Sequence, residues 1–302
     1  MPALICGSLA FDTITTFPGR FAEQILPDQV HILNVSFLVP TLRREFGGCA
    51  GNIAYNLQAI GGQPMILAAL GVDGGDYFAR VAGWGADTSL IHRDTELHTA
   101  QCHITTDRDN NQITAFHPGA MSHAHHVAVP ARTDLAIGNI APDGRDAMWQ
   151  HAHQMHTQGV PFIFDPGQQL PQFDGAEHRE ILGLARWVAV NDYEARMLQD
   201  RTGETPAQMS LRPNIEGVVV TLAEHGCELW IRGERTAVAG VKATAVVDPT
   251  GCGDAFRAAL LYGLERGWAL PRCVALGNRV GAIKIAERGP QNHRLEGVLE
   301  GA

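Results

Sequence analysis

Short apolar runs separated by stretches of helical spacing make up most of this 302-residue chain. "ALICGSLAFD" opens with a β-branched and apolar run that breaks at Gly7 and Ser8, and "PMILAALG" is a second such run. Beyond Pro130, the runs "DLAIGNI", "VPFIFDPG", "WVAVND" and "GVVVTLAEHG" alternate with segments of helical composition. This alternation predicts an α/β fold in which helices cover both faces of a parallel sheet.

Polar residues recur where these predicted strands end. They are Asn139, Asp165, Asn191 and Thr221, and Asp12 lies just past the first strand. Ligands of open parallel sheets gather outside the carboxyl ends of the strands, so the pattern predicts a ligand site at that edge.

Two segments predict additional β-structure. "TAQCHITTDRDNNQITAFHPGA" reads as a hairpin of two alternating strands, and "HILNVSFLV", residues 31–39, reads as a half-exposed strand. "GGCAGNIAYNLQAIGG" instead predicts a helix that begins after paired glycines and ends before Gly61 and Gly62.

Composition narrows the classes of function. The formal charge is −9 and no Lys/Arg block occurs, which disfavours nucleic acid as a partner. The six cysteines are scattered without a C-x-x-C pair, so a reducing, cytoplasmic environment is expected. The first residues lack the pattern of a signal peptide and no run reaches the length of a membrane span, so no membrane association is expected.

The segment "DPTGCGDAF", Asp248 to Phe256, carries the strongest chemical pattern. Apolar residues recur at helical spacing after it, so Gly251, Cys252 and Gly253 are expected to begin a helix whose free N–H groups and dipole attract an anion such as phosphate. Asp254 would be repelled there unless it has its own task, such as accepting a proton from an attacking hydroxyl. The pattern therefore suggests phosphoryl transfer to an alcohol.

Other interpretations of this segment remain. It could be only a helix start with an acidic first turn. The P-loop signature is absent, and Phe256 stands where a dinucleotide fingerprint needs its third glycine.

With these motifs in order, nearly the whole chain resembles the ribokinase-like (PfkB) family of carbohydrate and nucleoside kinases. "DPTGCGD" is similar to the family's D-T-x-G-A-G-D signature, with Pro249 and Cys252 in place of the commoner Thr and Ala. "GGCAGN", Gly47 to Asn52, resembles the glycine motif that holds the sugar, and "NDYE" matches the N-x-x-E motif through Asn191 and Glu194. "VTLAEHG" resembles the strand and loop beside ATP.

The resemblance implies a role for each matching residue. The substrate would contact Asp12, Gly47, Gly48 and Asn52, and ATP would contact Asn191, Thr221, Gly226 and Asn278. Mg²⁺ would be held by Glu194, mostly through water, and Asp248 and Thr250 are candidate K⁺ ligands. Asp254 would be the base, and the N–H groups of Gly251, Cys252 and Gly253 would stabilise the transferring phosphoryl group.

The resemblance also implies the architecture: one ribokinase-like domain over residues 1–302, an α/β/α sandwich of three layers with a small β-sheet lid. The lid would be formed by segments near 13–45 and 97–120, with the hairpin at 99–117 and the strand near 31–39 excluding water from the reaction. Either a monomer or a homodimer is compatible with the sequence. Phe37 and Phe116 are candidate contacts to a base or sugar, or merely core of the lid.

The details of "GSLAFDT", "VHILNVSFLVP" and "LRREFGGCAGNIAYNL" look most like the bacterial adenosine-kinase-like branch. The expected activity is therefore ATP-dependent phosphorylation of a nucleoside, adenosine or several nucleosides, at its 5′-hydroxyl, as in purine salvage. A sugar kinase acting on ribose or fructose is the alternative within the enzyme class. A catalytically silent ligand-binding relative is the alternative outside it.

Two further groups invite other functions. The histidines of "HAHQMH" and "HPGAMSHAHH" could suggest zinc, but no acid or cysteine completes a usual set, and solvated surface is the simpler interpretation. Cys252 could be a redox switch because helix N-termini lower the pKa of a thiol, or simply a small residue in place of Ala.

Overall fold

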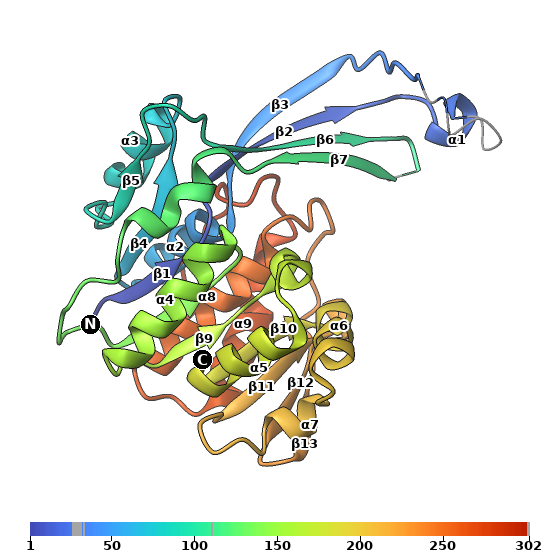
Figure 1. The fold of residues 1–302 in the computed structure, drawn as a ribbon. Coiled ribbons are helices and arrows are strands. Elements are labelled where there is room, and N and C mark those ends of the chain that lie inside the picture. Colours follow the sequence, from blue (N-terminus) through green and yellow to red (C-terminus); the bar gives the residue numbers. More distant parts are fainter. Residues whose placement is uncertain (26–31, 33, 110, 301–302) are drawn as a thin grey trace.

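The computed structural model describes residues 1–25, 32, 34–109 and 111–300, and its largest element is a nine-stranded sheet. The strand order is β13-β12-β11-β10-β9-β8-β1-β4-β5, in which all pairs but those of β12 and β13 are parallel (Figure 1). The strands are β1 (Ala3–Cys6), β4 (Pro64–Leu70), β5 (Ile91–Arg93), β8 (Ile137–Ile140), β9 (Phe162–Phe164), β10 (Trp187–Asn191), β11 (Gly217–Thr221), β12 (Cys227–Ile231) and β13 (Glu234–Val238). The predicted parallel sheet is confirmed.

Helices cover both faces of this sheet, because neighbouring residues of each buried strand point to opposite sides. Ile5 and Ile66 belong to one apolar cluster, while Leu4 and Leu67 belong to the other. The first cluster packs under α2 (Cys49–Ala59), α3 (Gly75–Gly83), α8 (Cys252–Glu265) and α9 (Leu270–Lys284). The second packs under α4 (Arg145–Thr157), α5 (Gly175–Leu184), α6 (Asp192–Thr202) and the short α7 (Pro206–Met209).

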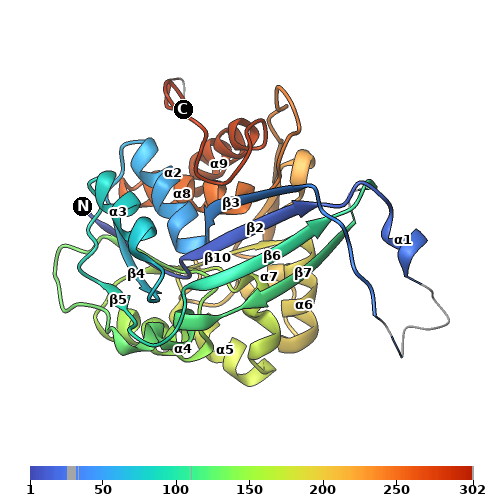
Figure 2. The same ribbon diagram turned by 90° about the horizontal axis from the view of Figure 1, so that it is seen from above.

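A second, four-stranded sheet extends above the main sheet, as Figures 1 and 2 show. Its order is β3 (Thr41–Gly47), β2 (Ala10–Thr16), β6 (Ala100–Thr106) and β7 (Gln112–His117). The predicted hairpin is confirmed as β6 and β7, which pair antiparallel. The sequence predicted Asp12 just past a strand, but Asp12 lies within β2. The chain turns at residues 7–9 after β1 and then continues as β2.

The prediction of a strand at residues 31–39 is wrong for those of its residues that the structure describes. Residues 34–39 form no strand, residues 31 and 33 lie outside the described residues, and the strand that pairs with β2 is β3. Phe37 in this segment is apolar for another reason, because it packs on two other aromatic rings. Its ring centroid lies 4.9 Å from that of Phe17 and 5.0 Å from that of Phe21. Phe21 opens α1 (Phe21–Gln24) at the far end of the small sheet.

Asn139 is also placed differently from the expectation. It lies inside β8 and its side chain is fully buried, so it does not face the ligand edge. The structure also describes the short 3₁₀ segments η2 (Gly119–His126), η3 (Gly167–Gln172) and η4 (Ala223–His225).

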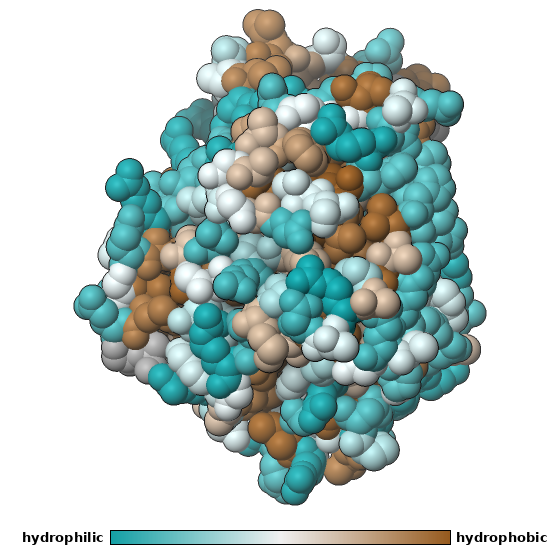
Figure 3. Space-filling model, turned by 90° about the vertical axis from the view of Figure 1, so that its left-hand side faces the viewer, coloured by the Kyte–Doolittle hydropathy of each residue, from teal (hydrophilic) through white to brown (hydrophobic). Residues whose placement is uncertain are grey.

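Polar side chains predominate on the face in Figure 3, where apolar side chains form only small separate patches. Within the described part of the chain, we find no helix with the length and apolar character needed to cross a membrane.

The α8–α9 contact provides a test of how tightly this layer is packed. A methyl group built on Gly277 of α9 would lie 2.5 Å from the Phe256 ring, whereas one on Gly281 meets nothing closer than 3.8 Å. Gly277→Ala should therefore destabilise the protein by about 1–3 kcal/mol through overpacking. Gly281→Ala should stabilise it by about 0.5–1 kcal/mol, because alanine is the better helix former.

Urea denaturation of both variants measures these changes. Equal effects of the two substitutions would contradict the packing at Phe256.

Candidate active site

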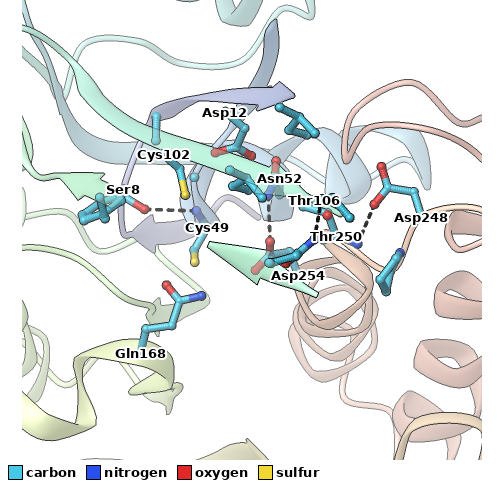
Figure 4. A pocket seen from close by; sticks show the side chains of 18 of the residues that line it. Ser8, Asp12, Cys49, Asn52, Cys102, Thr106, Gln168, Asp248, Thr250 and Asp254 are labelled. Atoms are coloured by element: carbon cyan, nitrogen blue, oxygen red, sulfur yellow. Dashed lines mark hydrogen bonds between the residues drawn. The ribbon is translucent and has the colours of Figure 1, made fainter. Parts of the chain in front are cut away.

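A cavity of about 1280 Å³ lies between the small sheet and the main body of the molecule. Its walls come from the inner face of the small sheet, the start of α2, the loop before α8, and η3. Figure 4 shows Asp12 from β2, Asn52 from α2 and Asp254 from α8 around this space, with Gln168 of η3 on another side. Three of the residues predicted from the sequence are thus brought together from distant parts of the chain.

Asp254 lies in the first turn of α8, half-buried at the edge of the cavity. Its Oδ2 accepts a hydrogen bond of 2.8 Å from Asn52 Nδ2. Burial raises the pKa of Asp254, and the hydrogen bond from Asn52 partly opposes that rise. The carboxylate is therefore oriented toward the cavity and more basic than an exposed aspartate, which suits an acceptor of protons.

Asn52 is itself held by a buried network that the sequence did not indicate. Asn52 Oδ1 accepts a hydrogen bond of 3.0 Å from Gln291 Nε2. Gln291 Nε2 also donates a hydrogen bond of 2.8 Å to Tyr77 Oη. Tyr77 in turn donates to the carbonyl oxygen of Gly47 at 2.6 Å. Because Gln291 can only donate through Nε2, it sets the amide orientation of Asn52 so that Nδ2 faces Asp254.

The paired glycines before α2 are required by close contacts. A Cβ on Gly47 would lie 2.2 Å from Asp12 Oδ2. Gly48 has φ +83°, and its Cβ would lie 2.6 Å from the carbonyl oxygen of Ser8. The bare backbone thus lets the small sheet and α2 approach, with Asp12 lying against the glycines.

Asp12 is an almost fully buried carboxylate to which no hydrogen bond from another described residue is assigned. Burial raises the pKa of Asp12 to about 7, and the negative charges of Asp254, Glu45 and Asp248 add to the rise. A carboxylate that faces a cavity without protein donors is suited to accept hydrogen bonds from ligand hydroxyl groups.

The loop before α8 turns tightly around Asp248. Its Oδ1 accepts from the amide of Thr250 at 3.0 Å and its Oδ2 from the amide of Gly289 at 3.0 Å. Burial tends to raise the pKa of Asp248, but these hydrogen bonds and the nearby Lys284 lower it overall. Asp248 is therefore a structural anion that holds the loop in shape.

The helix start predicted at Gly251, Cys252 and Gly253 is confirmed, because α8 begins at Cys252 with Gly251 as its N-cap. Gly251 has φ +80°, and a Cβ there would lie 2.6 Å from Pro290 Cβ. The amide of Gly253, in the first turn, has no acceptor within its own helix. The amide of Cys252 instead donates to the carbonyl oxygen of Pro249 at 3.2 Å, so it is already used by the turn.

A buried ion pair lies beneath the loop, on the next turn of α8. Arg257 Nη2 is 3.0 Å from Asp165 Oδ1, donates to the carbonyl oxygen of Ala189 at 3.0 Å, and lies 4.0 Å from Glu194 Oε2. Asp165 follows β9, so it reaches the ligand edge as expected. The sequence suggested no role for Arg257, because its position on the apolar face of α8 becomes meaningful only beside Asp165.

The N-x-x-E residues begin α6. The Asn191 side chain accepts from the amide of Glu194 at 2.7 Å, and the Glu194 side chain accepts from the amide of Asn191 at 2.8 Å. This reciprocal capping box fixes both side chains at the carboxyl end of β10. Glu194 Oε2 is used here, which leaves Oε1 for a ligand such as metal-bound water.

The remaining residues predicted to contact ATP lie beside the cavity rather than in its wall. Thr221 pairs with Asn191 in register and ends β11. Gly226 has φ +91°, and a Cβ there would lie 2.1 Å from the carbonyl oxygen of Val238. Asn278 of α9 donates to the carbonyl oxygen of Ala239 at 2.9 Å and accepts from Cys227 Sγ at 3.3 Å. These contacts bring the four predicted ATP residues to one end of the main sheet.

The histidines of the two clusters differ in their contacts and burial. Among the described residues, no group of three or more His, Cys, Asp or Glu side chains has a geometry that could hold a metal ion. His123 Nδ1 instead lies 2.6 Å from Asp94 Oδ2. The expectation of solvated surface is wrong for His151, which is fully buried with Nε2 2.9 Å from the carbonyl oxygen of Val127.

Cys252 is not activated by the helix start. Burial raises the pKa of Cys252 to about 11, although the charge of Lys284 opposes the rise, so the thiol is protonated at neutral pH. Two other cysteines, Cys49 and Cys102, line the cavity. Burial raises the pKa of both thiols, so they contribute surface of low polarity.

Comparison with known proteins agrees with this geometry. The model of the pfkB family carbohydrate kinases matches residues 20–296. The structure of Burkholderia thailandensis nucleoside kinase in complex with inosine is similar, with 46% identity, a TM-score of 0.87 and coverage of 96% of this chain and 93% of that chain. The structure of the same kinase in complex with ADP-inosine is 48% identical, with a TM-score of 0.84 and coverage of 96% and 91%. Methanocaldococcus jannaschii nucleoside kinase is 26% identical over 262 residues, which cover 86% of this chain and 85% of that protein.

The raised pKa of Asp12 predicts how the stability of the ligand-free protein depends on pH. With a folded pKa of about 7 and an ordinary unfolded value, the folded carboxyl keeps a proton that the unfolded chain releases. Stability should therefore fall as pH rises from about 4 to 7, and Asp12→Asn should remove that loss. The difference in free energy of unfolding between the variant and the wild type should therefore be roughly 2–4 kcal/mol more favourable to the variant at pH 8 than at pH 4.

Thermal unfolding at both pH values measures this gain. Asp76→Asn, at an exposed carboxylate on α3, is the control and should show no such pH-dependent difference. A stability difference for Asp12→Asn that does not grow with pH would contradict the prediction.

Proposed function

The chain belongs to the pfkB family of carbohydrate kinases, phosphotransferases that act on a hydroxyl group, and we propose that it transfers the γ-phosphoryl group of ATP to the 5′-hydroxyl of a nucleoside. The observation that carries this proposal is the cavity itself. Asp12, Asn52 and Asp254 lie together in its wall, while Ile14, Ile104 and Phe116 line it farther along the small sheet and glutamines line the opposite side.

The inner face of the small sheet supports a substrate with a base. Successive inward positions on β2 are Asp12 and Ile14, and their partners on β6 are Cys102 and Ile104. Phe116 lies opposite Cys102 on β7. Sugar hydroxyls would bind Asp12 beside Gly47, and the flat face of a base would lie against the apolar residues farther along the strands.

The opposite wall offers groups that can bind the polar edge of a base. Gln168, Gln169 and Gln172 of η3 line the cavity. A carboxamide both donates and accepts hydrogen bonds, so it can pair with the 6-oxo or the 6-amino edge of a purine. Adenosine and inosine are accordingly both proposed as substrates, which supports a broad purine nucleoside kinase over one limited to adenosine.

Asp254 is proposed as the general base. It would accept the proton of the 5′-hydroxyl as that oxygen attacks the γ-phosphorus, with ADP leaving on the far side. Asn52 holds the carboxylate in position through its 2.8 Å hydrogen bond. The free amides at the start of α8, with the positive end of the helix dipole, would stabilise the transferring group.

ATP is proposed to lie over the carboxyl ends of β10 and β11, where Asn191, Thr221, Gly226 and Asn278 gather. The donor set there fits Mg²⁺, which prefers oxygen ligands and keeps several waters. Glu194 Oε1 would hold it through water, and the ion would neutralise charge on the phosphate oxygens. The positive charge of Arg257, which pairs with the buried Asp165, would offset part of the negative charge beside the proposed ATP site.

An assay of ADP release with Mg·ATP tests the proposal. The panel contains adenosine, inosine, guanosine, cytidine, ribose, fructose and fructose 6-phosphate. Turnover with purine nucleosides and none with free sugars is expected, because the apolar lid surface would contact only a substrate that carries a base. Turnover with ribose or fructose alone would instead indicate a sugar kinase. ATP binding without turnover on any acceptor would contradict the nucleoside kinase proposal and favour a silent relative.

Asp254→Asn tests the base. The variant should retain binding of Mg·ADP but lose roughly 10²-fold or more in kcat, because the amide cannot accept the hydroxyl proton. Calorimetry with Mg·ADP and steady-state kinetics are the measurements. Asp146→Asn, a matched change in the first turn of α4 outside the cavity, should leave kcat unchanged. Near-normal turnover by Asp254→Asn would rule out Asp254 as the base.

A further inference from the structure

Lys284 is a buried ammonium group beside the loop that begins α8. It is the last residue of α9 and its side chain is fully buried. Its Nζ donates to the carbonyl oxygen of Asp248 at 2.7 Å and to that of Glu287 at 3.2 Å. The chain has only one other lysine, the exposed Lys242. A buried lysine loses its hydration, so a position that retains one needs a compensating anion or set of carbonyl groups.

The groups around Lys284 connect the two segments that flank the anion hole. Asp248 begins the loop that leads to Gly251, and its carboxylate accepts the amide of Gly289 in the second segment. Pro290 of that segment lies so near Gly251 that a Cβ on Gly251 would be 2.6 Å from Pro290 Cβ. The ammonium thus joins the carbonyl groups of both segments at one point.

The family implies a K⁺ ion here, held by carbonyl groups and an aspartate, with Asp248 and Thr250 as the candidate ligands. The residues present do not fit that ion. Both carboxylate oxygens of Asp248 already accept backbone amides, and Arg43 Nη2 lies 3.3 Å from Oδ2. The Asp248 carbonyl oxygen already accepts from Lys284 Nζ. A second cation would be repelled by the ammonium and the guanidinium.

We propose that the Lys284 ammonium is a built-in replacement for the monovalent cation, so that phosphoryl transfer by this chain does not depend on K⁺. An alkylammonium and K⁺ carry the same charge, and both bind carbonyl oxygens. Lys284 would act as a positioning residue: it holds the Asp248 carbonyl group, balances the Asp248 carboxylate and so keeps the amides of the anion hole aligned.

A purely structural role is the competing explanation. A lysine at the last turn of a helix commonly donates to the free carbonyl groups of that end and balances the helix dipole. Such a cap would stabilise α9 without taking the place of an ion. The two explanations differ in whether an added cation can do the work of the missing ammonium.

The first measurement uses the wild-type protein. Its melting temperature and its affinity for Mg·ADP are followed as KCl replaces choline chloride at constant ionic strength. Neither should change beyond the effect of NaCl, because the cation position is already filled. A K⁺-specific rise in melting temperature or in affinity would overturn the proposal. These readouts need no acceptor, so they remain decisive even if the nucleoside kinase proposal fails.

The second measurement uses two variants. Lys284→Ala leaves space for an ion and should lose roughly 10- to 100-fold in rate without K⁺, as expected when anion-hole groups lose their alignment. About 100 mM KCl or NH₄Cl should restore much of that rate and raise the melting temperature by mass action. Lys284→Met fills the space without charge and should not respond to either salt. Lys242→Met, at the other lysine, should remain independent of K⁺ whatever its basal rate.

A folded Lys284→Ala variant whose rate and melting temperature ignore K⁺ and NH₄⁺ would overturn the proposal in favour of the helix cap. If that variant does not fold, the wild-type titration still tests the K⁺ independence that the proposal requires, and a K⁺-specific effect there would overturn it. When no acceptor has been identified, Mg·ADP affinity replaces the rate as the readout for every variant.

Discussion

Crowding of negative charge in one cavity is the constraint on which the rest of this structure depends. Asp12 lies close enough to Asp254, Glu45 and Asp248 that the negative charges of these three residues contribute to its raised pKa. Like charges in a region of low dielectric repel strongly, so each carboxylate needs its own compensation. Asp248 has amides and Lys284, Asp254 has Asn52, and Asp12 is left for the ligand.

These different environments separate the roles of chemically identical groups. Asp248 is held by amide donors and has a lowered pKa, so it remains a fixed anion in the loop. Asp254 is half-buried with one amide donor and has a raised pKa, as a base requires. Asp12 lies against Gly47 with an open side toward the cavity. Burial and the number of donors therefore distinguish a structural carboxylate, Asp248, from Asp254, the proposed base, and Asp12, the proposed binding group.

The small sheet and the main body are linked through the same residues. Gly47 ends β3, lies against Asp12 of β2, and accepts the Tyr77 hydroxyl group, which Gln291 connects to Asn52. Movement of the small sheet would therefore be transmitted to the hydrogen bond between Asn52 and Asp254. This connection offers a physical route by which binding under the sheet can align the proposed base.

The sequence by itself determined the elements whose cause is local. Apolar runs predicted the parallel strands, paired glycines predicted the start of α2, and "GCGDAF" predicted a helix start with an acid in its first turn, because periodicity and backbone freedom act over a few residues. Only the tertiary structure decided which residues complete the site. Gln291, Arg257 and Lys284 have no distinctive local pattern, and Phe37 alternates like a strand residue although it packs in an aromatic cluster. Their roles depend on partners far away in the chain, such as Lys284 on Asp248 and Gln291 on Asn52, and such contacts exist only once the chain has folded.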